Sequence, residues 1–579
     1  MQISQGLSWE KTIIDLFAAF QPKDTNTEFP FPYSDDNLAY LRVFNYVIVL
    51  IERQGCFIVK KEKNNTSSYH AVIIPNEMED NDVISKTGEM LGLTTSTMLH
   101  VLEVTNKEND SPLAVENMIK ALKNGLCSMR KIYNFGFEIK NDQTGNELIF
   151  PFLEWKINQP SNDFLDLTNL QLEDPDVRNK FTIVEAVFNA KEKLEETCYS
   201  IVTNGWETAI DKKFPVAKFG KFITTDRFEI EQYHEIQKLI EDHFQKSSKT
   251  RPLSIAVFGE PGSGKSFAIK QMTESFTTIE KDDISFLKFN LSHFIQIQDL
   301  YEAFQFIRDT TLKGKKVLVF WDEIDVEFNK CIYGWIDFFL QVMQDGVYYQ
   351  ASIEHSLGSP VFIFASSHDI SLEELLGKIK GIPAKDEKPN EVVTANANAE
   401  PVIIVTNDEP VKTVTNDEPV KIVTNDEPEN NASKTDNHYS TKIEDWISRI
   451  HGHIDIKGIN PNKDPELRVP ADTISVSLRK AILLRSILEK QWPMLFSKDL
   501  DNEYDDFRKA TCNIEEDLID LLIFKISEFK YGIRSFESII QMSHLHDKRR
   551  FSPSCLPSLD QFRAHVGDSD FKYLKNKLG

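Results

Sequence analysis

Short apolar runs alternate with longer amphipathic segments through the middle of the chain. The apolar runs predict buried strands at residues 254–258, 284–291, 317–320, 360–365 and 453–456. Helical spacing of apolar residues predicts helices at residues 229–244, 300–312 and 442–450. Strands that alternate with helices are typical of a parallel sheet in an α/β fold. The carboxyl ends of such strands form one edge, where ligands bind.

The flanking regions carry different patterns. Residues 1–215 show mixed signals and predict a separate N-terminal α/β domain, with helices at 37–53 and 181–202 and β-rich runs at 56–59, 71–74, 99–104 and 148–152. Three apolar stripes near the other end predict helices at residues 475–491, 514–529 and 535–545. These last helices predict a small helical domain.

A low-complexity segment interrupts the pattern. Between residues 381 and 440 the sequence Val-Thr-Asn-Asp-Glu-Pro starts at Val405, Val414 and Val423. Each copy ends in proline and has no amphipathic period, so neither a solenoid nor a stable strand is expected. We therefore expect a disordered acidic insertion. The chain then divides into residues 1–215, 216–380, 381–440 and 441–579.

Composition narrows the class of protein. The 579 residues exceed a single core, and 41% hydrophobic content is ordinary for globular domains. A formal charge of -24 argues against a nucleic-acid binder. The six cysteines are widely spaced without a Cys-x-x-Cys pair, which favours reduced thiols. No signal peptide or bilayer-spanning run is evident, so a cytoplasmic location without membrane contact is expected.

A phosphate-binding motif follows the first core strand. Residues 259–266 read Gly-Glu-Pro-Gly-Ser-Gly-Lys-Ser, between a predicted strand and a predicted helix. Glycines let successive N–H groups face phosphate oxygens, and the helix N-terminus adds positive potential. The Lys265 ammonium is expected at the β- and γ-phosphates, and the Ser266 hydroxyl at Mg²⁺. The expected nucleotide-binding residues are Gly259, Pro261, Gly262, Ser263, Gly264, Lys265, Ser266, Phe267 and Ser367.

Acidic and polar residues end two further core strands. The run from Val317 ends in Asp322 and Glu323, which should lie beside the phosphates. Asp322 is expected to hold Mg²⁺, and Glu323 to orient and polarise the attacking water. Asp325 is expected to be solvated or to be a capping residue. The run 360–365 ends in Ser366-Ser367-His368, and which of these contacts the nucleotide stays open.

Together these motifs resemble the AAA+ ATPases over about residues 216–550. The resemblance matches Gly259–Ser266 to Walker A and Phe320–Glu323 to Walker B, and places Phe219-Gly220 near the adenine. It implies a three-layer αβα ATPase core with a C-terminal α-helical lid. It also implies ATP and Mg²⁺ as cofactors.

Two arginines resemble those of the Clp/HslU-type branch. The segment 445–450, Asp-Trp-Ile-Ser-Arg-Ile, implies that Arg449 is an arginine finger reaching a neighbouring subunit. The segment Gly532-Ile533-Arg534 implies that Arg534 is a sensor-2 arginine within its own subunit. A guanidinium offers a fixed fork of donors that suits charge developing during phosphoryl transfer. The expected catalytic residues are Lys265, Asp322, Glu323, Arg449 and Arg534.

The sequence also departs from the family. The strand end Ser366-Ser367-His368 lacks the usual Asn or Thr, and Ser292-His293-Phe294-Ile295 replaces an aromatic-apolar-Gly pore loop. Three functions stay open. The first is an oligomeric, ring-forming ATPase that remodels a protein client or binds an adaptor through its N-terminal domain. The second is an ATP-gated switch or scaffold with little turnover, and the third a DNA-remodelling motor, which the acidic charge disfavours.

Overall fold

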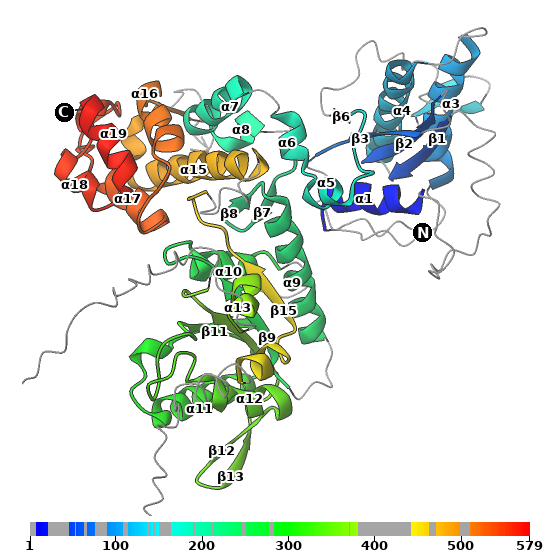
Figure 1. Ribbon diagram of the computed structural model, residues 1–579. Helices are drawn as coiled ribbons and strands as arrows, with labels where there is room; N and C mark the ends of the chain where they lie inside the picture. Colours follow the sequence, from blue (N-terminus) through cyan, green and yellow to red (C-terminus); the bar gives the residue numbers. More distant parts are fainter. Residues whose placement is uncertain are drawn as a thin grey trace, which may run out of the picture.

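A computed structural model shows three bodies around the long helix α9, Arg227–Gln245 (Figure 1). An antiparallel sheet body contains the N-terminus, a parallel sheet body lies beside α9, and a helical body contains the C-terminus. The structure describes residues 7–20, 46–51, 54–62, 67–75, 90–107, 114–135, 138–142, 145–149, 164–188, 191–210, 214–245, 251–276, 283–369, 371–379, 442–461, 470–497 and 510–578. The expected insertion at 381–440 lies outside these residues.

The N-terminal body is a four-stranded antiparallel sheet with helices on both faces. Its strand order is β1 (Tyr46–Ile51), β2 (Gly55–Lys61), β3 (Ser67–Ile73) and β6 (Leu165–Leu167). Alternate residues of β2 face opposite sides, so Phe57 packs with helix α1 (Trp9–Ala19) and Ile58 with helix α4 (Val115–Phe135). Helix α3 (Met90–Lys107) packs on α4, and β4 (Glu138–Asp142) pairs with β5 (Gly145–Ile149).

Two predictions for this body are wrong. Residues 46–51, predicted as part of a helix, form strand β1, because the run Tyr-Val-Ile-Val-Leu-Ile pairs along its whole length with β2. Residues 99–104, predicted as a β-rich run, lie within helix α3. A short apolar run fits either a strand or a buried helix, and only the neighbouring elements decide between them.

The central body is a five-stranded parallel sheet covered by helices on both faces. Its order is β10 (Ile284–Asn290), β11 (Lys316–Asp322), β14 (Val361–Ala365), β9 (Leu253–Phe258) and β15 (Gly452–Asp455). One face packs against α9 and α10 (Lys265–Glu274), and the other against α11 (Ile297–Leu312) and α12 (Ile336–Asp345). This confirms the expected parallel α/β sheet.

Smaller elements complete this body. The hairpin of β7 (Ala217–Phe219) and β8 (Phe222–Thr224) lies on α10. A second hairpin, β12 (Val347–Gln350) with β13 (Ile353–Ser356), extends away from the sheet (Figure 1). Helix α13 (Leu372–Ile379) follows β14, and residues 442–447 form a helical segment before β15.

The helical body is built around helix α15, Pro470–Gln491. Around it lie α16 (Glu516–Asp520), a π-helix (Leu521–Lys525), α17 (Ile533–Met542), α18 (Leu559–Arg563) and α19 (Asp568–Leu578). The predicted helix 514–529 is thus shorter and ends in a π-helical turn. Residues 496–497 and 511–512 form a short ribbon, β16–β17.

Helices from before residue 215 also belong to the helical body. The predicted helix 181–202 is divided into α6 (Ile183–Val187) and α7 (Lys191–Asn204), and α8 (Trp206–Ile210) follows. Helix α7 packs on α15, where the buried Arg485 donates hydrogen bonds to the carbonyls of Val202 and Thr203. The expected division at residue 215 therefore does not coincide with the packing, because α15 needs α7 to cover its apolar face.

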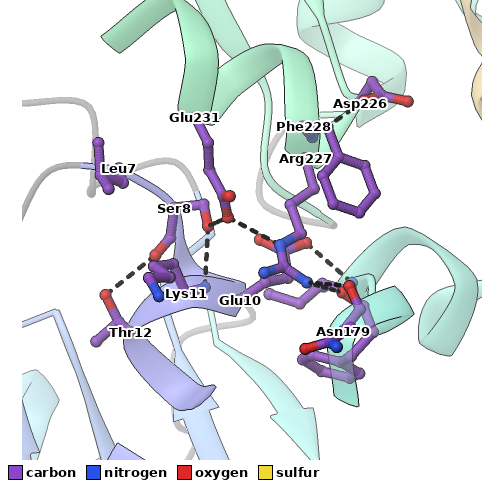
Figure 2. Close-up of polar contacts among 12 residues, drawn as sticks. Leu7, Ser8, Glu10, Lys11, Thr12, Asn179, Asp226, Arg227, Phe228 and Glu231 are labelled. Carbon is purple, nitrogen blue, oxygen red and sulfur yellow. Dashed lines mark hydrogen bonds and ion pairs between the residues drawn. The ribbon is translucent and has the colours of Figure 1, made fainter. Parts of the chain in front are cut away.

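The N-terminal body is attached to α9 by a polar junction (Figure 2). The buried Arg227 guanidinium donates to the Glu231 carboxylate at 2.8 Å and to the Phe181 carbonyl at 2.7 Å. Ser8 donates to the same Glu231 carboxylate. The backbone N–H of Ile183 donates to the Glu10 carboxylate, whose pKa is raised by burial. The start of α9 thus contacts two distant segments of the chain, at Ser8 and at Phe181.

Candidate functional site

The phosphate-binding loop connects β9 to α10 at the carboxyl edge of the parallel sheet. Gly262 and Gly264 have φ of 83° and 90°, a left-handed region that favours glycine. Gly264 precedes α10, whose first helical residue is Lys265. The predicted strand–loop–helix context is therefore present, and the N-terminus of α10 faces the loop. Phe267 is 51% exposed on α10, and the Ser263 hydroxyl is buried with no hydrogen-bond partner among the described residues.

Lys265 is buried inside the loop. Its ammonium donates to the carbonyls of Gly259 at 2.7 Å and Glu260 at 3.1 Å. Burial lowers the pKa of Lys265 to about 8, against the opposing fields of Asp322 and Asp325. The loop carbonyls thus hold the Lys265 ammonium inside the loop. Phosphate oxygens of a bound nucleotide would compete with these carbonyls for its hydrogen bonds.

Asp322 and Glu323 leave the sheet beside this loop. Asp322 is the last residue of β11 and pairs with Asn290 on one side and Ala365 on the other. Glu323 has φ of 59°, an uncommon left-handed conformation for a residue with a side chain. Such strained positions cluster at functional sites, because surrounding structure must hold them.

The Asp322 carboxylate and the Ser266 hydroxyl, at the carboxyl edge of the sheet, both contact the ammonium of Lys288. The Lys288 ammonium, from β10, lies 2.9 Å from the Asp322 carboxylate and 3.2 Å from the Ser266 hydroxyl. Hydroxyl and carboxylate oxygens are the ligands that Mg²⁺ prefers, with substrate phosphates completing the shell. The residues present therefore fit a divalent cation, which Ser266 and Asp322 would hold. No motif in the sequence pointed to Lys288, because it lies inside an apolar strand.

The end of β14 is held by a buried carboxylate. Asp325 is 2% exposed and accepts hydrogen bonds from the Ser366 hydroxyl and from the backbone N–H groups of Ser367 and His368. The expectation of a solvated Asp325 is wrong, because its carboxylate is buried and binds the end of β14 rather than capping a helix. These donors lower the pKa of Asp325 against its desolvation, which is the largest effect and raises it. Sequence reasoning missed this network because its members lie 41 to 43 residues apart along the chain.

The helical body closes over the phosphate-binding loop. A Cβ atom on Gly262 would lie 2.5 Å from the Tyr531 carbonyl oxygen and 3.4 Å from the Arg534 side chain. Arg534 is exposed and close enough to Lys265 to lower its pKa. The structure therefore brings Arg534 to the loop. Its role as a nucleotide sensor stays a prediction.

A second contact joins the helical body, which forms a lid over the phosphate-binding loop, to that loop through residues 456–458. The backbone N–H of Ile456 donates to Phe258, directly before the loop. Arg479, on α15, donates to the carbonyls of Lys457 and Gly458 at 2.7 Å each and to the buried Glu229 carboxylate. Arg479, α9 and the loop are thus connected through one short segment.

Arg449 lies away from its own phosphate-binding loop. It follows the helical segment 442–447, which packs on the face covered by α11 and α12, whereas α10 covers the opposite face. Its guanidinium donates to the Gln344 side chain at 2.9 Å and to the Asp445 carbonyl. The structure therefore does not bring Arg449 to Lys265 of the same chain.

The segment expected near the adenine lies beside α10. Gly220 has φ of 59° at the turn of the β7–β8 hairpin. The Lys221 N–H donates to the Gln271 side chain at 2.6 Å, and the Phe219 ring packs on Tyr233. The hairpin thus flanks the helix that begins at the loop. A contact with adenine stays a prediction.

The described residues contain no group of three or more His, Cys, Asp and Glu side chains placed to hold a metal ion by themselves. None of the described helices has the length and apolar character needed to cross a membrane.

Comparison with known proteins gives a distant structural likeness. No protein-family model matches the chain, and no curated protein matches its sequence. Among solved structures it is similar to the S. cerevisiae Hsp104–ADP complex, with 13% identity and a TM-score of 0.28. The alignment covers 64% of this chain and 50% of that chain, so this chain spans about half the length of its match. An identity this low says nothing about function, and a TM-score this low supports no further argument. The proposal of a function therefore rests on the geometry of the site.

Proposed function

We propose that this chain is an Mg²⁺-dependent ATPase of the AAA+ class. The observation that carries the proposal is the meeting of three separate segments at one edge of the parallel sheet. They are the loop 259–266, the strand end at Asp322-Glu323, and the lid segment 531–534 packed against Gly262. A glycine-rich turn that occurred by chance would not be expected to lie beside both an acidic strand end and a basic lid segment.

The proposed chemistry assigns a role to each group. Backbone N–H groups of the loop and the Lys265 ammonium bind the phosphates, and Glu323 orients and polarises the attacking water. Mg²⁺, when bound by Ser266 and Asp322, supplies positive charge beside the transferred phosphoryl group. Arg534 adds a guanidinium from the lid, since it already lies near Lys265.

Substitution of Glu323 tests the reaction. Glu323→Gln keeps the size of the side chain but removes the base, so ATP should still bind while the steady-state ATPase rate falls by about 10²- to 10⁴-fold. Glu327→Gln is the matched control, because Glu327 is exposed four residues further on. A Glu323→Gln protein that hydrolyses ATP at the wild-type rate would rule out the assigned role.

One observation favours a second function, an ATP-gated switch with little turnover. The Ser366 hydroxyl, at the end of β14, is already bonded to Asp325 and Tyr333 within a buried network. A strand end engaged in this way has less freedom to sense phosphate. Tight ATP binding by the wild type together with an ATPase rate no higher than that of Glu323→Gln would select the switch.

The proposal extends to assembly and partners. Arg449 lies on the face away from its own loop, which is consistent with action on a neighbouring subunit in a homo-oligomer, in the manner of an arginine finger. The N-terminal body is attached through the junction at α9, and we assign it the binding of a protein client or adaptor. A pull-down with Glu323→Gln, which should retain ATP, would recover such a client, and recovery of the chain alone would favour a self-assembling switch.

A further inference from the structure

Lys288 is a basic residue within β10, an edge strand of the central sheet. Strand β10 is parallel to β11, and Lys288 lies opposite Phe320 in their register. Its ammonium is 5.5 Å from the centre of the Phe320 ring and lies on the face covered by α10. Its side chain is directed to the edge where α10 begins, because both of its polar partners lie there.

The partners of Lys288 are the two side chains that fit a divalent cation. Its ammonium lies 2.9 Å from the Asp322 carboxylate and 3.2 Å from the Ser266 hydroxyl. An ion pair this exposed, with the Lys288 side chain at 45%, contributes little to folding. A contribution to the stability of the fold therefore does not explain why a lysine lies at this position.

We propose that Lys288 is a tethered counter-cation that occupies the divalent-metal position between Ser266 and Asp322 and is displaced when the metal binds. The identity of the metal as Mg²⁺ rests on the proposed function. The ammonium and the metal need the same two oxygens, and two cations repel strongly at such distances. Their occupancy is therefore mutually exclusive. Lys288 thus raises the metal concentration at which the site fills and neutralises Asp322 until then.

Metal binding without nucleotide tests the proposal directly. Mn²⁺, which binds the same oxygen ligands, is titrated into nucleotide-free wild-type protein and Lys288→Met, and free Mn²⁺ is measured by electron paramagnetic resonance. Removal of the competing charge should tighten Mn²⁺ binding about five- to tenfold. Lys270→Met, on the exposed side of α10, removes the same charge from the neighbouring helix and should leave the affinity unchanged. Unchanged or weaker Mn²⁺ binding by Lys288→Met overturns the proposal.

A second measurement separates this inference from the proposed function. ATP affinity is measured with Mg²⁺ and with EDTA, and Lys288→Met should lower the Mg²⁺ concentration that gives half of the metal-dependent increase. Equal loss of ATP affinity with and without Mg²⁺ would make Lys288 a phosphate ligand and overturn the proposal. Absence of ATP binding by the wild type would refute the proposed function, while the Mn²⁺ titration still decides the inference. If Lys288→Met fails to fold, Lys288→Gln provides the same charge removal.

Discussion

Gly262 shows at the scale of one residue how the loop and the lid depend on each other. It has φ of 83°, and a Cβ atom there would lie 2.5 Å from the Tyr531 carbonyl oxygen. A left-handed residue with a side chain costs about 1–2 kcal/mol before any collision is counted. The backbone carbonyl cannot move away without shifting the lid.

Gly262→Ala is therefore expected to weaken nucleotide binding about tenfold or more, as measured by titration with a fluorescent ATP analogue. Gly377→Ala is the matched control, because Gly377 lies in α13 with no atom within 4 Å of an added Cβ. That change should leave binding unaltered and stabilise the helix slightly. Equal affinities for both variants would show that the close approach of Tyr531 is unimportant.

Lys480 is a buried cation on α15 with a structural role. Its ammonium donates to the Ile526 carbonyl at 2.8 Å and to the Ile523 carbonyl, and it faces the Phe529 ring. Burial lowers the pKa of Lys480 to about 8, although the field of Asp570 opposes this. The folded protein therefore binds fewer protons at this site than the unfolded chain does between about pH 8 and the unperturbed value of 10.5.

Because the unfolded state holds more protons in this window, Lys480 should make stability rise with pH from about 8 to 10.5. Below pH 8 the cost of the buried charge is present in full. The difference in melting temperature between wild type and Lys480→Met should shift in favour of the wild type across this window. A difference that is constant with pH would mean that the ammonium stays charged in the folded protein.

At the scale of elements, the first turn of α9 connects all three bodies. Arg227 contacts the N-terminal body, while Asp226 accepts from Lys457 at 2.9 Å and Glu229 accepts from Arg479 at 2.7 Å. Glu229 is 1% exposed, so its charge depends on the guanidinium beside it. A movement of α15 relative to the loop would therefore act on α9 directly.

Arg227→Ala should loosen the N-terminal body from α9. Loss of these charge-assisted hydrogen bonds costs about 2 kcal/mol, so amide exchange in residues 175–180 should be roughly thirtyfold faster. Hydrogen–deuterium exchange read by mass spectrometry measures this. Lys238→Ala, on the exposed side of the same helix, should leave exchange there unchanged. Unaltered protection in Arg227→Ala would place the attachment elsewhere.

The hydrophobic pattern of the sequence was enough to predict some strands but not others. Strands β9, β11 and β14 agree with their predicted runs to within one or two residues, because each is buried on both faces and reads as a continuous apolar run. Residues 46–51 and 99–104 were assigned wrongly because spacing alone does not distinguish a half-buried strand from a helix. Pairing with β2 decided the first, and packing on α4 the second.

At the scale of the whole molecule, the site is completed by a body distant in sequence. The loop lies at residues 259–266 and the lid segment at 531–534, yet they are in contact through Gly262 and Tyr531. Arg449 is held by Gln344 at the opposite face of the sheet. One chain thus contains both the site that we propose and the arginine that we propose to act on another copy.

Mixing two inactive variants tests this arrangement. Arg449→Ala and Glu323→Gln should each lose most of their ATPase activity as pure proteins. In a mixed oligomer, intact Glu323 of one subunit can meet intact Arg449 of another, so part of the activity should return. Absence of recovery, together with full activity of isolated wild-type monomers, would exclude action between subunits.

The sequence by itself determined the phosphate-binding loop, its acidic strand end and the parallel α/β class. These depend on local spacing, since glycines, lysine and hydroxyl must follow one another and buried strands must be apolar. Only the tertiary structure decided that α7 belongs with α15, that Asp325 holds the end of β14, and that Lys288 lies between Ser266 and Asp322. Those facts depend on contacts between residues far apart in the chain, which no local pattern encodes.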